Sequence, residues 1–132
     1  METLTEAECW ALLSTTTVGR IAVALDGGVD IFPLNFVAKD QLIYFRSAPG
    51  SKLVELTANP VLAFEADGRR RFRRWSVVVR GEAKRLDDDD EIERSGVLEL
   101  RTAPADDKWN YVRITPRTVT GRRFPLQSAS KS

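Results

Sequence analysis

The chain has 132 residues, of which 20 are Lys or Arg, 19 are Asp or Glu, one is cysteine and none is histidine. Without histidine there is no His-activated serine or cysteine nucleophile and no His-ligated zinc, copper or haem. The single Cys9 forms neither an intrachain disulfide nor a CxxC pair. An enzyme of this composition therefore needs carboxylates or a bound cofactor for its chemistry, and we expect no metal site.

Length, charge and hydropathy set further limits. The length fits one domain, and the net charge of +1 gives no general attraction to polyanions. The acidic start at Glu2 lacks the basic and apolar regions of a secretory signal, and no apolar run approaches the ~18 residues needed to cross a bilayer. We expect a cytoplasmic protein that binds neither nucleic acid nor membranes.

The first half of the chain predicts a helix followed by a three-stranded meander. The helix runs from Thr5 to Leu13, with Thr5 as its N-cap. Strands are expected at 21–25, 29–37 and 42–46, joined by turns at 26–28 and 39–40. Pro33 indicates an edge or a bulge in the second strand. Residues 51–58 have the composition of a short helix, ended by Asn59-Pro60.

The second half predicts more strands and another helix. Strands are expected at 61–66, 75–86 and 109–119. A basic connection at 67–74 joins the first two, and the third is interrupted near Pro116. The acidic run that starts at Asp87 opens a helix that extends to about Arg101, because carboxylates favour the positive end of the helix dipole.

This order of elements predicts a mainly β fold. Six mostly antiparallel strands with helices in the gaps favour a small six-stranded antiparallel barrel with peripheral helices over a doubly wound sheet. We expect a single domain over residues 1–124 and a frayed tail over 125–132.

The segment Arg46-Ser47-Ala48-Pro49-Gly50-Ser51-Lys52-Leu53 is a candidate phosphate site. A lysine in the first turn of a helix is electrostatically unfavourable unless an anion binds there. Arg46, Ser47 and Ser51 add further donors, so the segment resembles a phosphate cradle at a helix N-terminus. The alternative is an ordinary strand–turn–helix link with a solvated Lys52.

The segment Phe32-Pro33-Leu34-Asn35-Phe36 is a second candidate. A proline in a strand leaves backbone donors and acceptors available to a flat heterocycle, and Asn35 offers both kinds of group. The alternative is a kinked barrel strand in which Asn35 caps its own bulge.

Two basic segments complete the candidates. The run Arg69-Arg70-Arg71-Phe72-Arg73-Arg74-Trp75 is compatible with a solvated hairpin tip, with contact to an anionic cofactor or substrate tail, or with nucleic-acid binding. The acidic run at 87–91 argues against the last. Gly121-Arg122-Arg123-Phe124 either reaches a neighbouring subunit's site or forms a frayed terminus.

Several segments occur in a recognisable order: Ser14-Thr15-Thr16-Thr17-Val18-Gly19-Arg20-Ile21-Ala22-Val23, Pro33-Leu34-Asn35-Phe36, Ile43-Tyr44-Phe45-Arg46-Ser47, Gly50-Ser51-Lys52-Leu53, Asn59-Pro60, Trp75-Ser76-Val77-Val78-Val79-Arg80-Gly81-Glu82-Ala83, Arg113-Ile114-Thr115-Pro116 and Gly121-Arg122-Arg123-Phe124. Together they resemble the pyridoxamine 5'-phosphate oxidase-like flavin-binding split-barrel family, over nearly the whole chain. The resemblance implies a six-stranded split β-barrel that forms a homodimer, with flavin sites between the subunits.

The resemblance also implies roles for individual residues. The flavin phosphate falls on Arg46, Ser47, Ser51 and Lys52, and the ring edge lies along Phe32–Phe36. Ser76 occupies a position at which the oxidase that gives the family its name carries a glutamine that contacts the flavin ring. We further expect Trp75 and Trp109 to wall the ring, and Arg122 or Arg123 to arrive from the partner subunit.

The implied activity is that of an FMN-dependent oxidoreductase acting on a small-molecule redox substrate. Pyridoxamine phosphate is not the expected substrate, because the chain has no histidine for the vitamer-binding Arg-x-His segment. Alternatives are FAD as cofactor, or a reductase that uses the deazaflavin coenzyme F-420 and binds its anionic tail through Arg69–Arg74. A non-catalytic flavin-binding or sensing module is a third alternative.

Overall fold

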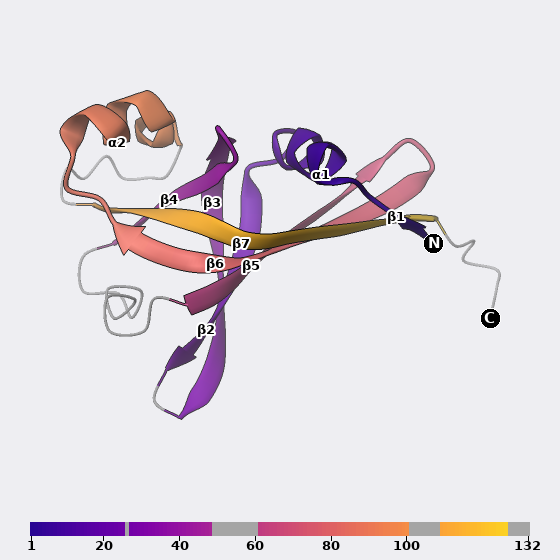
Figure 1. The fold of residues 1–132 in the computed structure, drawn as a ribbon, viewed down its shortest axis with the longest axis horizontal. Helices are drawn as coiled ribbons and strands as arrows, with labels where there is room; N and C mark the ends of the chain where they lie inside the picture. Colours follow the sequence, from indigo (N-terminus) through magenta and orange to yellow (C-terminus); the bar gives the residue numbers. More distant parts are fainter. Residues whose placement is uncertain (26, 49–60, 101–108, 127–132) are drawn as a thin grey trace.

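The computed structural model describes residues 1–25, 27–48, 61–100 and 109–126. The segment expected to form a helix at 51–58 lies outside these residues. The elements are β1 (Glu2–Thr3), α1 (Glu6–Leu13), β2 (Val18–Leu25), β3 (Gly28–Lys39), β4 (Leu42–Ser47), β5 (Val61–Arg70), β6 (Arg73–Arg85), α2 (Asp89–Ser95), the 3-10 helix η2 (Val97–Glu99) and β7 (Asn110–Pro125). Figure 1 shows their arrangement.

The strands form one antiparallel sheet that closes on itself. Their order is β1-β7-β4-β3-β2-β5-β6, and a further pairing of β6 with β7 completes a ring of six strands, with β1 added to β7. The fold is therefore the predicted six-stranded antiparallel split β-barrel with peripheral helices. None of the helices in the described part of the chain is long and apolar enough to span a membrane.

Alternating side chains fill the barrel. In β6 the buried positions are Trp75, Val77, Val79, Gly81 and Ala83, while the residues between them are more exposed, as expected for a strand with one face on a core. The same alternation in the other strands supplies Ile21, Phe36, Phe45, Phe64 and Ile114, all fully buried. The rings of Phe36 and Phe64 meet edge to face with centroids 4.8 Å apart.

Helix α1 begins as predicted at the N-cap Thr5, which forms a capping box with Glu8. It packs on β7 at Gly121, where an added Cβ would lie 2.5 Å from Cys9 Sγ. The amide of Leu4 donates to the carbonyl oxygen of Gly121 at 2.9 Å. The missing side chain at Gly121 therefore lets the N-terminal segment lie directly on the strand.

The strand register corrects two sequence expectations and adds one strand. The segment 67–74 is not a connection, because β5 and β6 continue to a two-residue turn at Arg71-Phe72 with Arg70 opposite Arg73. Strand β7 does not end near 119 but continues to Pro125 along β6. Strand β1, which the sequence analysis missed, pairs with β7 at Arg122 and Arg123.

Helix α2 is also shorter than expected. It ends at Ser95, because Gly96 takes a left-handed conformation with φ of 82° and acts as a C-cap. The following residues form the short η2 instead of continuing to Arg101. Both elements cover a second apolar cluster outside the barrel, which includes Tyr44 and Val97.

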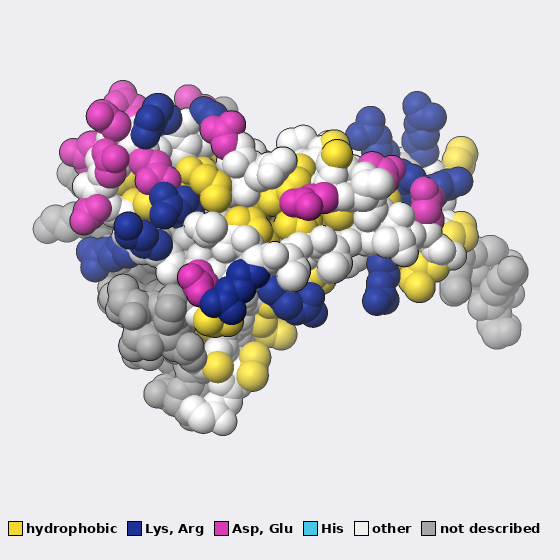
Figure 2. Space-filling view, viewed as in Figure 1, with side chains coloured by type: hydrophobic (Ala, Val, Ile, Leu, Met, Phe, Trp, Pro, Cys, Tyr) yellow, Lys and Arg dark blue, Asp and Glu magenta, His cyan; other side chains and the backbone are white. Residues whose placement is uncertain are grey.

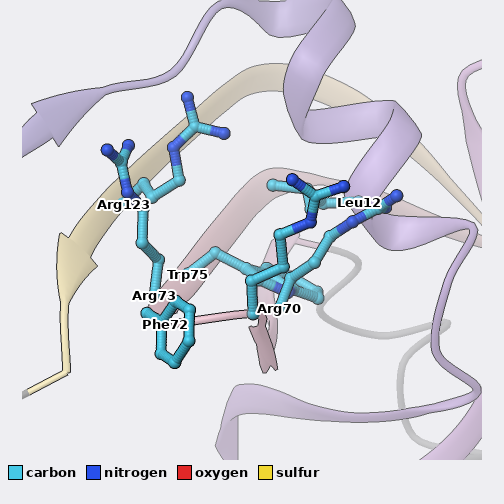
Figure 3. Close-up of a pocket in the computed structure, with 7 residues that line it drawn as sticks. Leu12, Arg70, Phe72, Arg73, Trp75 and Arg123 are labelled. Carbon is cyan, nitrogen blue, oxygen red and sulfur yellow. The ribbon is translucent and has the colours of Figure 1, made fainter.

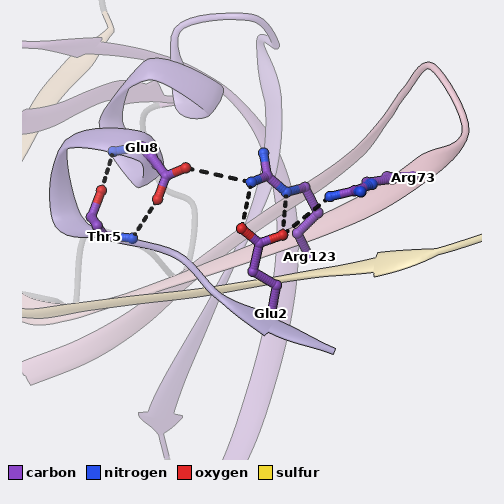
Figure 4. A network of polar contacts seen from close by, with 5 residues as sticks. All are labelled: Glu2, Thr5, Glu8, Arg73 and Arg123. Carbon is purple, nitrogen blue, oxygen red and sulfur yellow. Dashed lines mark hydrogen bonds and ion pairs between the residues drawn. The ribbon is translucent and has the colours of Figure 1, made fainter.

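The N-terminal segment is tied to the barrel by ion pairs, drawn in Figure 4. Arg123 donates to Glu2 Oε2 at 2.8 Å and lies 3.4 Å from Glu8 Oε2, and Arg73 donates to Glu2 Oε1 at 3.1 Å. The hydrogen bond from Arg123 lowers the pKa of the Glu2 carboxyl, and hydrogen bonds from Thr5 lower the pKa of Glu8. Both carboxylates therefore favour the folded state when ionised.

We expect Glu2→Gln to weaken the pH dependence of folding stability. In the folded protein both carboxyl groups have a pKa below the ordinary value of 4.5. Their contribution is thus present above about pH 4.5 and lost as the pH falls through the lower folded values. Urea unfolding of the natural chain between about pH 5 and 3 should show this loss, and Glu2→Gln should show less of it. Equal slopes for both proteins would contradict the assignment.

We expect Gly81→Ala to destabilise the barrel by about 2–3 kcal/mol, the upper range for overpacking. A Cβ at this position would overlap the carbonyl oxygen of Thr115 and lie 2.9 Å from Pro116 Cα, both backbone atoms that cannot rotate away. The neighbouring exposed Arg80 provides the control, because Arg80→Ala should change stability by less than about 0.5 kcal/mol. Urea denaturation midpoints measure both.

Candidate functional site

A first group of predicted site residues meets where β3, β4 and β7 adjoin. Phe36 lies opposite Phe45 in the β3–β4 pairing. In the β4–β7 pairing Arg46 lies opposite Tyr111, and Ser47 opposite Asn110. The C-terminal end of the 32–36 segment thus adjoins the start of the predicted phosphate segment.

Arg46 is held in place by its neighbours. Its guanidinium carbon lies 4.8 Å from the centroid of the Trp109 ring, a cation–π distance. It also donates to the carbonyl oxygen of Leu100. The structure therefore brings the side chains of Arg46 and Trp109 together.

Ser47 is the most informative residue of this group. Its side chain is only 4% exposed, and its hydroxyl oxygen has no hydrogen-bond partner among the residues that the structure describes. A buried polar group without a partner costs about 1–3 kcal/mol, so such a hydroxyl is suited to a ligand. The other predicted phosphate contacts, Ser51 and Lys52, lie outside the described residues.

The register explains how the 32–36 segment faces its surroundings. The Phe36 amide donates to the carbonyl oxygen of Thr17 at 2.9 Å. In an antiparallel ladder, pairs of opposite residues that exchange backbone hydrogen bonds alternate with pairs that do not. Even-numbered residues of β3 therefore bond to β2, and Pro33 faces the other side. There the pairing with β4 begins only at Phe36, so within the described chain Pro33 lies on an edge. The β2–β3 register has no shift at Pro33, so the proline marks an edge and not a bulge.

Side chains of the same segment divide between two faces. Phe36 is buried, and Phe32 and Leu34 pack against the core. Pro33 and Asn35 alternate with them and point to the outer face of the barrel. Of the five predicted ring contacts, these two are the ones whose side chains a ligand on the outer face can meet.

A second group of predicted residues lies on β6 and β7. Trp75 is opposite Arg123, and Ser76 is opposite Arg122. Ser76 and Arg122 share the outer face, whereas Trp75 is buried and Arg123 is engaged by Glu2 and Glu8. Arg122 is exposed. Alternation along the strands thus splits this group into an outer pair and a pair beside α1.

The two groups are far apart within one chain. From Asn110 to Arg122 the strand β7 is on the order of 40 Å long at its usual rise per residue. In Figure 1, β7 runs along the longest dimension of the molecule. One chain therefore does not bring all the predicted site residues together.

Sequence analysis missed a charged cluster on the outer face between these groups. Arg20 on β2 contacts Glu65 at 2.5 Å and Asp67 at 3.8 Å, both on β5. Burial, followed by the hydrogen bond with Asp67, raises the pKa of Glu65. Arg20 lies opposite Pro33, and Asp67 opposite Ser76. Strand alternation puts each residue on the outer face, but only the register joins them.

Solved structures with similar folds come from several bacteria. A FAD-binding protein from Mycobacterium smegmatis is 37% identical with a TM-score of 0.82, covering 96% of this chain and 100% of its own. A Corynebacterium glutamicum protein, named as a candidate pyridoxamine 5'-phosphate oxidase, is 39% identical with a TM-score of 0.83, covering 96% and 95%. A FAD-binding protein from Mesorhizobium loti is 31% identical with a TM-score of 0.79, covering 92% and 94%.

The sequence itself matches a family profile over almost its full length. The profile is described as pyridoxamine 5'-phosphate oxidase and matches residues 5–123. This range contains both groups of predicted site residues and the six-stranded ring except the last two residues of β7. The chain therefore belongs to the pyridoxamine 5'-phosphate oxidase family.

Proposed function

We propose that this protein is a homodimeric flavin-binding oxidoreductase whose substrate is a small molecule other than pyridoxamine phosphate. The observation that carries the proposal is the buried Ser47 hydroxyl without a described partner, beside Arg46 at the end of β4. Both residues fall where the sequence predicts a phosphate cradle. Side chains alternate along β4, so the Ser47 hydroxyl lies on the core side with Phe45 and the Arg46 guanidinium lies on the other side with Trp109. A phosphate at the end of the strand would take one donor from each.

Each residue of the first group has a defined task in this proposal. Arg46 and Ser47 hold the phosphate, with Ser51 and Lys52 completing the cradle as the sequence predicts. The edge of β3 at Pro33 and the Asn35 side chain orient the ring, and Trp109 walls it. A bound flavin supplies the hydride or electron transfer, and the protein supplies position and exclusion of water.

FMN is the cofactor we favour, since the phosphate cradle needs only one phosphate group. FAD is the second candidate because two of the solved relatives, 37% and 31% identical, are named FAD-binding. Coenzyme F-420 is the third. Whichever flavin binds, its phosphate is expected at Arg46 and Ser47.

The second group of residues supports a site built from two subunits. Ser76 and Arg122 lie on the order of 40 Å along β7 from Asn110, so we place them at the flavin bound by the partner. The sequence analysis expected Arg122 or Arg123 from the partner. Because Ser76 lies opposite Arg122, the same subunit then supplies both.

An apolar outer face supports the dimer. Val29 and Ile31 on β3 are 70% and 67% exposed, and Val18 and Val61 are about half exposed. In the register Ile31 lies opposite Ala22, and Ala22 opposite Ala63, so apolar residues form a row across three strands. Figure 2 shows yellow side chains over the lower part of the molecule, where β2 and β3 lie. A second copy covering this patch would remove it from water.

Titration with FMN, FAD and coenzyme F-420, followed by absorbance and fluorescence, tests the cofactor. We expect at least one to bind with Kd below about 100 μM. Arg46→Gln and Ser47→Ala should each weaken binding about tenfold or more, because each removes a hydrogen bond to the phosphate.

Arg80→Gln is the matched control for charge, because Arg80 is exposed and lies opposite Thr118, eight residues along β7 from Asn110. This variant should bind flavin like the natural chain. The proposal fails if none of the three cofactors binds, or if the control loses as much affinity as Arg46→Gln.

Turnover separates the oxidoreductase from a sensing module. In a sensing module the bound reduced flavin should be reoxidised slowly and without preference among oxygen and quinones.

Ile31→Glu should convert the dimer into a monomer, because it places a charge in the centre of the apolar patch. Light scattering after size-exclusion chromatography measures the mass. Leu98→Glu is the control, because Leu98 is also exposed, at 49%, but lies on η2 away from the patch. If the natural chain is monomeric at about 100 μM, the dimer proposal is wrong.

A further inference from the structure

A cavity of about 430 Å³ lies between α1 and the β5–β6 hairpin. It is lined by Leu12, Arg70, Arg71, Phe72, Arg73, Trp75 and Arg123. Figure 3 shows Arg73 and Arg123 on one side and Arg70 on the other. The volume is within the usual range for small-molecule sites, roughly 300–1,000 Å³. We refer to this cavity as the arginine pocket.

The arginine pocket carries uncompensated positive charge. Arg73 and Arg123 are paired with Glu2 and, for Arg123, with Glu8. Arg70 and Arg71 make no ion pair with any residue that the structure describes. Figure 2 shows dark blue side chains gathered at the end of the molecule where this hairpin lies. Two guanidinium groups are thus available, and each suits bidentate contact with a phosphate.

Apolar and aromatic side chains form the rest of the lining. Phe72 is 84% exposed at the hairpin tip, so its ring is accessible to a ligand. Trp75 and Leu12 are buried and form the inner wall. An exposed aromatic face beside arginines is suited to stacking on a planar ring.

We propose that the arginine pocket binds a phosphorylated molecule with a planar ring, about the size of a mononucleotide. Arg70 and Arg71 hold the phosphate, and the Phe72 ring stacks on the planar group. The pocket lies on the face of the hairpin opposite to Ser76 and Arg122, because strand neighbours alternate. It is therefore a site separate from the proposed flavin contacts, and Trp75 and Arg123 belong to its lining.

Calorimetric titration with AMP tests the proposal, with and without saturating FMN. We expect AMP to bind with Kd below about 1 mM in both cases, and the affinity to fall as salt is added. The double variant Arg70→Gln/Arg71→Gln should weaken binding tenfold or more. Phe72→Ala should weaken it as well, while inorganic phosphate and adenosine should each bind at least tenfold more weakly than AMP.

The matched control is the double variant Arg69→Gln/Arg74→Gln. It removes the same charge from the same hairpin, but Arg69 and Arg74 lie opposite each other in the β5–β6 register, on the other face of the hairpin. Its AMP affinity should change less than threefold. The proposal is overturned if AMP does not bind, if both double variants lose affinity equally, if inorganic phosphate binds as tightly as AMP, or if FMN displaces AMP. Flavin titration is a separate measurement, so either proposal can fail while the other stands.

Discussion

Closure of the barrel by β6 and β7 is the constraint on which the rest of the structure depends. Their pairing runs from Arg73 opposite Pro125 to Arg85 opposite Val112. Because β7 also pairs with β4 and with β1, this strand joins the ends of the sheet and anchors the N-terminal segment. A side chain at Gly81 would disturb this closure, since its Cβ would overlap the backbone of Thr115 and Pro116 beside the bulge.

The length of β7 has a direct consequence for function. Its beginning adjoins Ser47 and its end adjoins Ser76, so residues that share a flavin in the proposal lie at opposite ends of one strand. In the proposal a single barrel therefore presents two half-sites and not one site. If the proposed dimer covers the apolar face of β2, β3 and β5, each subunit would supply a different half to each flavin, and assembly would then be a condition for cofactor binding.

Sequence patterns predicted most of the barrel, since alternation and turn residues are local signals. Pro33 indicated the edge that it occupies in the described part of the chain, and Thr5 correctly indicated a helix start. The arginine-rich hairpin was mistaken for a loop, because β6 pairs with both β5 and β7 as far as Arg73, and this long-range pairing outweighs the low β propensity of the segment. Gly96 was a usable signal for the end of α2. The division of the site residues into two groups depends on strand register, which no local pattern contains.

Register also explains how a chain with a net charge of +1 concentrates positive charge. Pairing β1 with the end of β7 brings Glu2 to Arg123 and Arg73, and these ion pairs neutralise one side of the arginine pocket. Arg70 and Arg71, at and beside the two-residue turn, make no ion pair with these carboxylates. The ion pairs fix Arg73 and Arg123 before a ligand binds, so binding would order fewer side chains on that side, while Arg70 and Arg71 keep their charge for an anion. Balanced composition and a local anion site thus follow from the same strand pairing.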